Sequence, residues 1–107
     1  MARGFRVLAV HDVQETLAEK GFERGPLKIV EVCNAKFAHE ATKAEIGAAA
    51  FMPCRYTVHT SGDRTVLTLA RPTMLSELMP GAGLRELATE VEEILREAML
   101  AALHAPS

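Results

Sequence analysis

Two cysteines are the residues of this chain whose type and placement best fit a chemical role. Cys33 immediately precedes Asn34, a residue type that favours the start of a helix, and Cys54 follows Pro53 at the start of a later extended segment. A sulfur atom near the positive end of a helix ionises and reacts more readily. If the extended segments that carry the two cysteines pair in a sheet, both sulfur atoms lie at the same end of the molecule.

Three functional interpretations of the cysteine pair are open. It fits a redox dithiol, a carrier of sulfur or persulfide, or a soft-metal site that His39 completes. The structural alternative is simple burial, because free cysteine is among the most buried residue types and often packs as a small apolar side chain. Two cysteines without close spacing fall well short of a four-ligand zinc signature, so the sequence assigns neither a metal nor a cofactor. The candidate site residues are Cys33, Asn34, His39 and Cys54.

The histidines and acidic residues have structural explanations. His39 lies one helical turn from Lys43 and three residues from Lys36, which indicates a solvated helix face. The four histidines share no metal-binding spacing, and no serine lies in a nucleophile-elbow pattern. Four glutamates are expected on the solvated side of a long C-terminal helix: Glu90, Glu92, Glu93 and Glu97. We therefore predict no catalytic residue, and the chain is better explained as a protein that is not an enzyme.

Length and composition indicate one globular domain over residues 1–107, with residues 104–107 as a frayed tail. Of the 107 residues, 49% are hydrophobic and 24% are charged, which suits a single core. The formal net charge is -2 and charges of both signs are mixed along the chain, which argues against nucleic acid as a partner. No apolar segment has the length of a signal peptide or a membrane span, so we expect a cytoplasmic protein without a membrane partner.

Hydrophobic spacing and turn residues predict the order of the elements. Strands are expected at 5–10, 27–33, 55–60 and 65–70, the last two joined as a hairpin by a glycine-bearing turn. Helices are expected from Asp12 to a stop at Gly21, over 35–46, as a turn at 74–78, and from Leu84 for about 20 residues. This order predicts an α+β fold with about four strands in an antiparallel or mixed sheet and with helices mainly on one face.

Six segments carry a family resemblance that covers nearly the whole chain: Gly4–Leu8, Lys28–Asn34, Phe37–His39, Ile46–Gly47, Met52–Cys54 and Arg71–Pro72. They resemble the bacterial and archaeal domain of unknown function 302. The most specific part is the Cys33-Asn34 pair that opens a helix, together with the Pro53-Cys54 pair that opens the next strand. The resemblance implies a TATA-binding-protein-like α+β sheet, usually assembled as a dimer, and it implies no established activity.

Two features depart from the pattern of that family. Ala35 stands where family members usually have proline, so the first helical turn keeps a backbone amide that proline lacks. Family domains also usually begin with an additional strand and helix ahead of the segment that starts here at Gly4. A sheet without that edge strand exposes unpaired backbone and apolar surface. We therefore expect either a truncated start or a partner that supplies the missing part, and we hypothesise a homodimer.

The function favoured by these features is non-enzymatic. We expect a dimeric domain that binds a small ligand or a protein partner in the groove between sheet and helices. The alternative is a thiol-based redox, sulfur-carrier or soft-metal-binding protein that uses Cys33 and Cys54. A purely structural assembly element is a third class.

Overall fold

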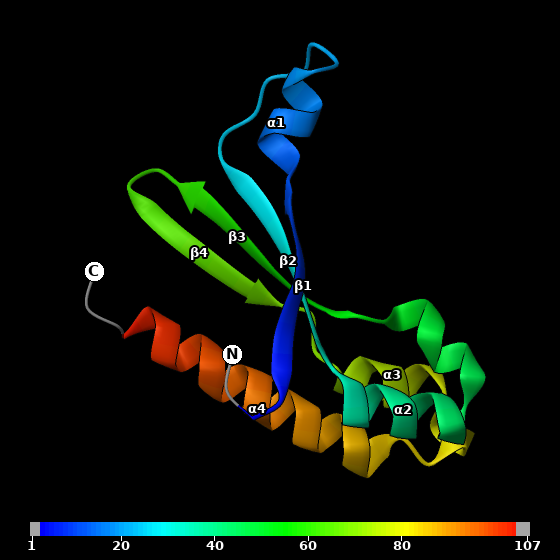
Figure 1. Cartoon of the computed structure of the whole chain (residues 1–107). Coiled ribbons are helices and arrows are strands. Elements are labelled where there is room, and N and C mark those ends of the chain that lie inside the picture. The colour runs from blue at the N-terminus through cyan, green and yellow to red at the C-terminus, as the bar shows by residue number, and fades with distance from the viewer. Residues whose placement is uncertain (1–2, 105–107) are drawn as a thin grey trace.

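The computed structural model describes residues 3–104 and has the α+β architecture expected from the sequence (Figure 1). Its strands are β1 (Phe5–Asp12), β2 (Leu27–Asn34), β3 (Cys54–Ser61) and β4 (Arg64–Leu69). Its helices are α1 (Val13–Ala18), α2 (Ala35–Ala44), α3 (Thr73–Leu78) and α4 (Arg85–Leu103), and the 3-10 helices are η1 (Ile46–Phe51) and η2 (Pro80–Ala82). The expected four strands, and the hairpin among them, are confirmed.

The strands form one sheet in the order β1-β2-β3-β4, and each neighbouring pair is antiparallel. This selects the antiparallel sheet from the two predicted arrangements. Val32 of β2 faces Val7 of β1 on one side and Cys54 of β3 on the other, so these residues form a row across the sheet. In the turn between β3 and β4, Gly62 has a φ of 63°, as the first central residue of a type II′ hairpin turn requires.

Helix α4 covers one face of the sheet and forms the main core with it (Figure 1). The predicted apolar spacing of this helix is the stripe that faces the sheet. The Tyr56 hydroxyl donates a hydrogen bond to the Leu95 carbonyl oxygen, so the polar end of this side chain is satisfied inside the core. The buried residues of this core are Phe5, Val32, Tyr56, Val91, Ile94 and Leu95.

A second, smaller core lies beyond one end of the sheet, where α2, η1, α3 and the start of α4 meet (Figure 1). Its buried residues are Ala41, Ala48 and Leu84, and Leu75 and Met79 pack against them. The predicted placement of helices mainly on one face therefore describes α4, whereas α2 and α3 lie at an end of the sheet. Helix α2 begins directly after the last residue of β2, so it starts beyond the end of the sheet. The other helices at this end bury the alanine side of α2.

The β1–α1–β2 segment projects as an arm from the other end of the sheet (Figure 1). Helix α1 begins as predicted, because the Asp12 side chain accepts a hydrogen bond from the Glu15 amide at 3.0 Å. It also stops as predicted, since Gly21 has a φ of 83° and the amides of Gly21 and Phe22 bond back to the last helical turn. No residue of α1 is buried and Phe22 is 63% exposed. Helix α1 and the turn after it thus add surface without adding core, whereas β1 and β2 each contribute a residue to the main core.

Helix α2 is shorter than predicted, and part of the predicted tail lies outside the described residues. Helix α2 ends at Ala44 rather than Ile46, and the unpredicted 3-10 helix η1 follows. Glu45 explains the break, because its side chain accepts from the Gly47 amide at 3.3 Å and caps a new helix. Of the predicted frayed tail, His104 follows the last turn of α4, and residues 105–107 lie outside the described residues.

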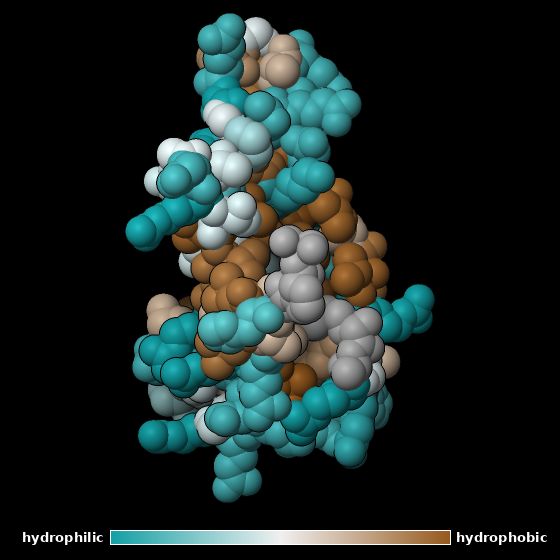
Figure 2. Space-filling model, turned by 90° about the vertical axis from the view of Figure 1, so that its left-hand side faces the viewer, coloured by the Kyte–Doolittle hydropathy of each residue, from teal (hydrophilic) through white to brown (hydrophobic). Residues whose placement is uncertain are grey.

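Apolar side chains gather in a band across the middle of the molecule when it is seen from the side of the β3–β4 turn (Figure 2). A groove of about 560 Å³ between α4 and the sheet is lined by Val30, Tyr56, Val58, Leu67, Ala98 and Met99. A second exposed apolar surface follows the edge strand β1, where Val7, Leu8 and Val10 are about half exposed. Within residues 3–104, no helix is both long enough and apolar enough to cross a membrane.

Candidate functional site

A cavity of about 280 Å³ lies where the ends of β2 and β3 meet the second core. The helices around it contribute apolar walls, with Phe37 from α2, Phe51 from η1, Leu75 from α3 and Leu87 from α4. The cavity exists because these helices leave the sheet at the same end and pack on one another. Ligand pockets of proteins are typically concave, mostly apolar and supplied with a few polar groups, and this cavity has that character.

Three of the four candidate residues named from the sequence line this cavity: Cys33, Asn34 and Cys54. The predicted order of strand, capped helix and strand between them is confirmed. Cys54 pairs with Val32 in the ladder, whereas Cys33 pairs with Arg6 on the neighbouring strand, so alternation places the two cysteines on opposite faces of the sheet. Both cysteines are free thiols.

The environment of Cys54 favours the protonated thiol. Burial raises the pKa of Cys54 to about 11, and the neighbouring Cys33 adds to the rise. Burial also raises the pKa of Tyr56 to about 12, with a further contribution from Cys54. The thiolate is the nucleophilic form of cysteine, so Cys54 is a weak nucleophile near neutral pH and behaves as part of the apolar wall.

Asn34 joins the first strand to the start of α2. Its Oδ1 accepts hydrogen bonds from the amides of Lys36 at 3.0 Å and Phe37 at 3.3 Å, which is the predicted helix cap. Its Nδ2 donates to the carbonyl oxygen of Arg3 at 3.0 Å. A Cβ at Gly4, which has a φ of 81°, would lie 2.6 Å from this Nδ2. Asn34 is therefore held on both ends of its amide and has a structural role in the wall of the cavity.

His39 lies apart from the other candidates. It is exposed on α2 and is not among the residues that line the cavity. Within residues 3–104 there is no group of three His, Cys, Asp or Glu side chains that is placed to hold a metal ion. A soft-metal site built from Cys33, Cys54 and His39 therefore lacks the geometry that it requires.

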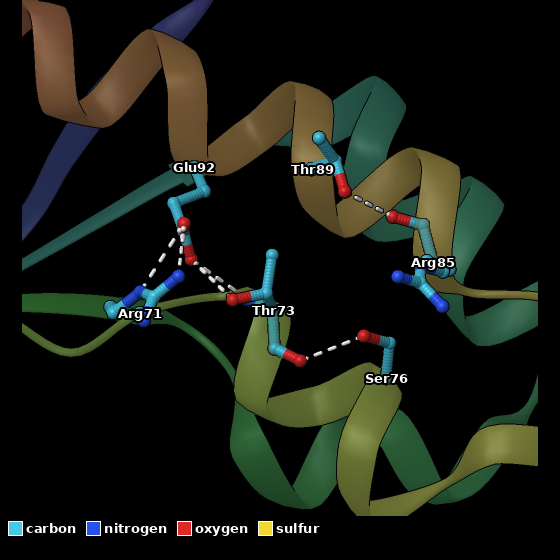
Figure 3. Close-up of polar contacts among 6 residues, drawn as sticks. All are labelled: Arg71, Thr73, Ser76, Arg85, Thr89 and Glu92. Atoms are coloured by element: carbon cyan, nitrogen blue, oxygen red, sulfur yellow. Dashed lines mark hydrogen bonds and ion pairs between the residues drawn. The ribbon is translucent and has the colours of Figure 1, made fainter.

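Glu92 has a role that the sequence analysis missed. Its carboxylate accepts from the amide of Thr73 at 3.1 Å and from the Thr73 hydroxyl at 2.6 Å, and Arg71 donates to its other oxygen at 3.2 and 3.3 Å (Figure 3). These contacts hold the start of α3 against α4. The expectation that Glu92 lies on a solvated face was wrong, since its side chain is 16% exposed. It borders the buried stripe of α4, where a neighbouring segment can cover it.

The electrostatics of Glu92 follow from these contacts. Partial burial raises the pKa of its carboxyl group, but the hydrogen bonds from Thr73 and Arg71 outweigh burial and leave the pKa below the usual value. A group with a lowered pKa contributes stability at pH values above its unfolded pKa, and that contribution disappears as the pH falls through the folded value. The contact between α3 and α4 is thus present at neutral pH.

Two arginines also line the cavity and were not predicted as site residues. Arg71 is held by Glu92, and Arg55 donates through Nε to Glu31 at 3.3 Å. Glu31 also contacts His11 at 2.9 Å, and hydrogen bonds from His11 and Arg55 lower the pKa of Glu31. The sequence signal for Arg71 was its place directly after a strand, beside Pro72 in the family pattern, but its pairing with a glutamate 21 residues away has no local signature.

A small α+β domain with a four-stranded antiparallel sheet and an apolar cavity at one sheet end is the class that the fold and the site define. The chain matches the family model described as "Domain of unknown function DUF302" over residues 1–102, and it belongs to this family. The crystal structure of an uncharacterized conserved protein DUF302 from Bacillus stearothermophilus is similar to it, with a TM-score of 0.82 and 34% sequence identity. That similarity covers 88% of this chain and 74% of the other chain. No protein of curated function matches this chain.

Proposed function

We propose that this domain binds a small, largely apolar ligand in the cavity at the end of the sheet and does not catalyse a reaction on it. The observation that carries the proposal is the cavity itself. Its volume of about 280 Å³ is close to the lower end of the roughly 300–1,000 Å³ range of small-molecule sites. Its walls come from side chains such as Phe37 and Leu75, which suit an apolar ligand.

The chemistry of the lining residues supports binding rather than catalysis. Cys54 is held as a thiol, and both ends of the Asn34 amide already have hydrogen-bond partners. A thiol nucleophile is activated by an adjacent base or by a lowered pKa; the pKa of Cys54 is raised, and His39, the histidine nearest to Cys33 in the sequence, is exposed elsewhere on α2. The lining thus offers contact surface, and that is what a binding protein needs.

The test is a variant that fills the cavity. Ala38 lines the cavity from α2 and is half-buried, so Ala38→Phe should occupy ligand space. At ten times the Kd, a bound ligand adds about 1.4 kcal/mol to the free energy of unfolding, which raises the Tm of a domain of this size by several degrees. We expect 1-octanol or octanoate to raise the Tm of the wild type and not that of Ala38→Phe.

The control is Ala35→Phe, which places the same residue at an exposed position of α2 that lines neither the cavity nor the groove between α4 and the sheet. This variant should respond to both probes as the wild type does. If neither probe binds the wild type, or if Ala38→Phe binds both as well as the wild type does, the cavity is not a ligand site.

We further propose that the chain forms a homodimer, in the TATA-binding-protein-like arrangement that the family resemblance implies. The chain exposes 7492 Å², whereas a compact monomer of 11.6 kDa exposes about 5,800 Å². The excess of about 1,700 Å² is close to the area that one subunit of an obligate dimer buries. The radius of gyration of 15.4 Å also exceeds the value of about 13 Å for a compact domain of this length.

The edge strand β1 is the surface that best suits this contact. Val7 and Val10 are exposed there, whereas the opposite edge strand β4 exposes Thr65 and Thr68. We expect light scattering after size-exclusion chromatography to give twice the chain mass for the wild type and a lower mass for a Val7→Lys/Val10→Lys variant. The matched variant Thr65→Lys/Thr68→Lys should stay dimeric. A folded wild-type protein that is strictly monomeric would exclude the dimer.

A thiol-based function is the second candidate, because Cys33 and Cys54 line the same cavity. A pKa of about 11 for Cys54 lies two units above the ordinary value, so its thiolate fraction near neutral pH is about 100-fold lower than usual. The Cys33→Ser variant loses the smaller, Cys33 contribution to this pKa but keeps the burial that is its larger cause, so we expect its Cys54 to react with a thiol reagent up to about 100-fold more slowly than free cysteine does, and to accelerate as the pH rises.

The Cys54→Ser variant then reports on Cys33 alone. Rapid modification of Cys33 near neutral pH, with Cys54 protected or linked to it in the wild type, would favour the redox or sulfur-carrier function. Slow labelling of both thiols would remove that candidate and leave ligand binding.

A further inference from the structure

We infer that the ligand of the cavity is an amphipathic acid, with an apolar body inside the cavity and an anionic group at its mouth. This inference rests on the proposed ligand-binding function and names its ligand class. Among the described residues that line the cavity, the charged ones are Arg55 and Arg71, and none is acidic. A mostly apolar site whose charged rim is entirely positive is complementary to an apolar anion.

The two arginines approach the cavity from the two faces of the sheet, because Arg55 contacts Glu31 on the face away from α4 and Arg71 contacts Glu92 on α4. Arg55 is in β3, and its carbonyl oxygen accepts a hydrogen bond from the amide of Ala70 at 3.1 Å, so Arg71 follows directly at the neighbouring position. Their side chains are 49% and 70% exposed. Both arginines thus line the cavity and are partly exposed to solvent, which suits a contact with an anionic group at its opening.

Both guanidinium groups keep donors for a ligand. Arg55 contacts Glu31 through Nε, and Arg71 contacts a single oxygen of Glu92 through Nε and Nη2. A guanidinium carries five N–H donors in a fixed fork, so the remaining groups of each arginine are available for a carboxylate. The glutamates fix the arginines in place while lying outside the set of residues that line the cavity.

The interior of the cavity favours an apolar body. Among the described side chains, every buried nitrogen and oxygen atom has a hydrogen-bond partner, so the walls present no unsatisfied group that a polar ligand would serve. A polar body would lose hydrogen bonds to water without replacing them. An apolar cavity of about 150 Å³ takes up benzene, and by that scale 280 Å³ accepts a body of roughly ten carbon atoms.

The test compares octanoate with 1-octanol, which have the same chain length and differ in the charge of the head group. Titration calorimetry on the wild type should give a Kd for octanoate about 10- to 25-fold lower than that for 1-octanol, because two exposed arginine–carboxylate contacts are worth roughly three- to fivefold each. Arg55→Gln and Arg71→Gln should each remove about three- to fivefold of the octanoate affinity and leave 1-octanol unchanged.

Two further variants separate the charge of the arginines from their structural role. Arg96→Gln removes an exposed arginine of α4 that does not line the cavity, and it should change neither Kd. Glu92→Gln keeps an acceptor for Thr73 but frees Arg71 from its ion pair, so octanoate should bind this variant at least as tightly as the wild type.

The outcomes distinguish the ligand class from the function itself. Equal affinity of the wild type for octanoate and 1-octanol would overturn the acid and leave the apolar site intact. Loss of 1-octanol binding together with octanoate binding in the arginine variants would show that the arginines shape the cavity, and this too would overturn the inference. Failure of both probes on the wild type would instead remove the proposed function.

Discussion

Leu95→Ala is expected to lower the free energy of unfolding by about 3–5 kcal/mol. Leu95 is completely buried, at 0% exposure, in the core between α4 and the sheet. Its removal loses the transfer free energy of the side chain and leaves a cavity among Phe5, Val32 and Tyr56, which come from three different strands and cannot all move in to fill it. Urea denaturation followed by circular dichroism measures the change.

Leu100→Ala is the matched control on the same helix. Leu100 is 45% exposed, and surface substitutions usually change stability by no more than about 0.5 kcal/mol. Both variants should be unfolded at two protein concentrations, because a loss at Leu100 that depends on concentration would place it in the dimer interface. Equal losses in the two variants at every concentration would contradict the assignment of the core face of α4.

The features that the sequence predicted well are those with a local cause. Asp12 and Asn34 cap helices through their own side chains, and Gly21 and Gly62 supply positive φ values at a helix end and a hairpin turn. Each of these residues acts on the few residues beside it. The apolar spacing of α4 belongs to the same group, because one helix must turn one stripe toward whatever buries it.

The features that the sequence did not predict depend on residues far apart in the chain. Glu92 was assigned to a solvated face, although it holds the start of α3 through Thr73 and Arg71. Helix η1 begins because the Glu45 side chain caps a new helix, within the stretch 35–46 that was predicted as one continuous helix. The cavity could not be predicted from the sequence, because its walls come from every helix at one end of the sheet. The cysteines were found by residue type, but their burial, which sets the thiol chemistry, depends on those walls.

Asn34→Ala is expected to lower the free energy of unfolding by about 1.5–2.5 kcal/mol, the sum of a lost helix cap of about 1 kcal/mol and a lost hydrogen bond to a backbone carbonyl oxygen of about 0.5–1.5 kcal/mol. The cap serves the amides of Lys36 and Phe37, and the carbonyl is that of Arg3. The loss should exceed that of Asp12→Ala, because Asp12 caps a helix without buried residues. Thermal and urea unfolding of the two variants give the comparison.

Asn34→Asp divides the two contributions, because aspartate keeps the oxygen that caps α2 and lacks the N–H that reaches Arg3. It should therefore recover the cap of about 1 kcal/mol and still lose the contact between α2 and the start of β1. If Asn34→Asp is as stable as the wild type, the contact with Arg3 carries no free energy. If Asn34→Ala loses no more than Asp12→Ala, Asn34 is a helix cap alone, and the first strand is held at this end by Phe5, which is 2% exposed in the main core.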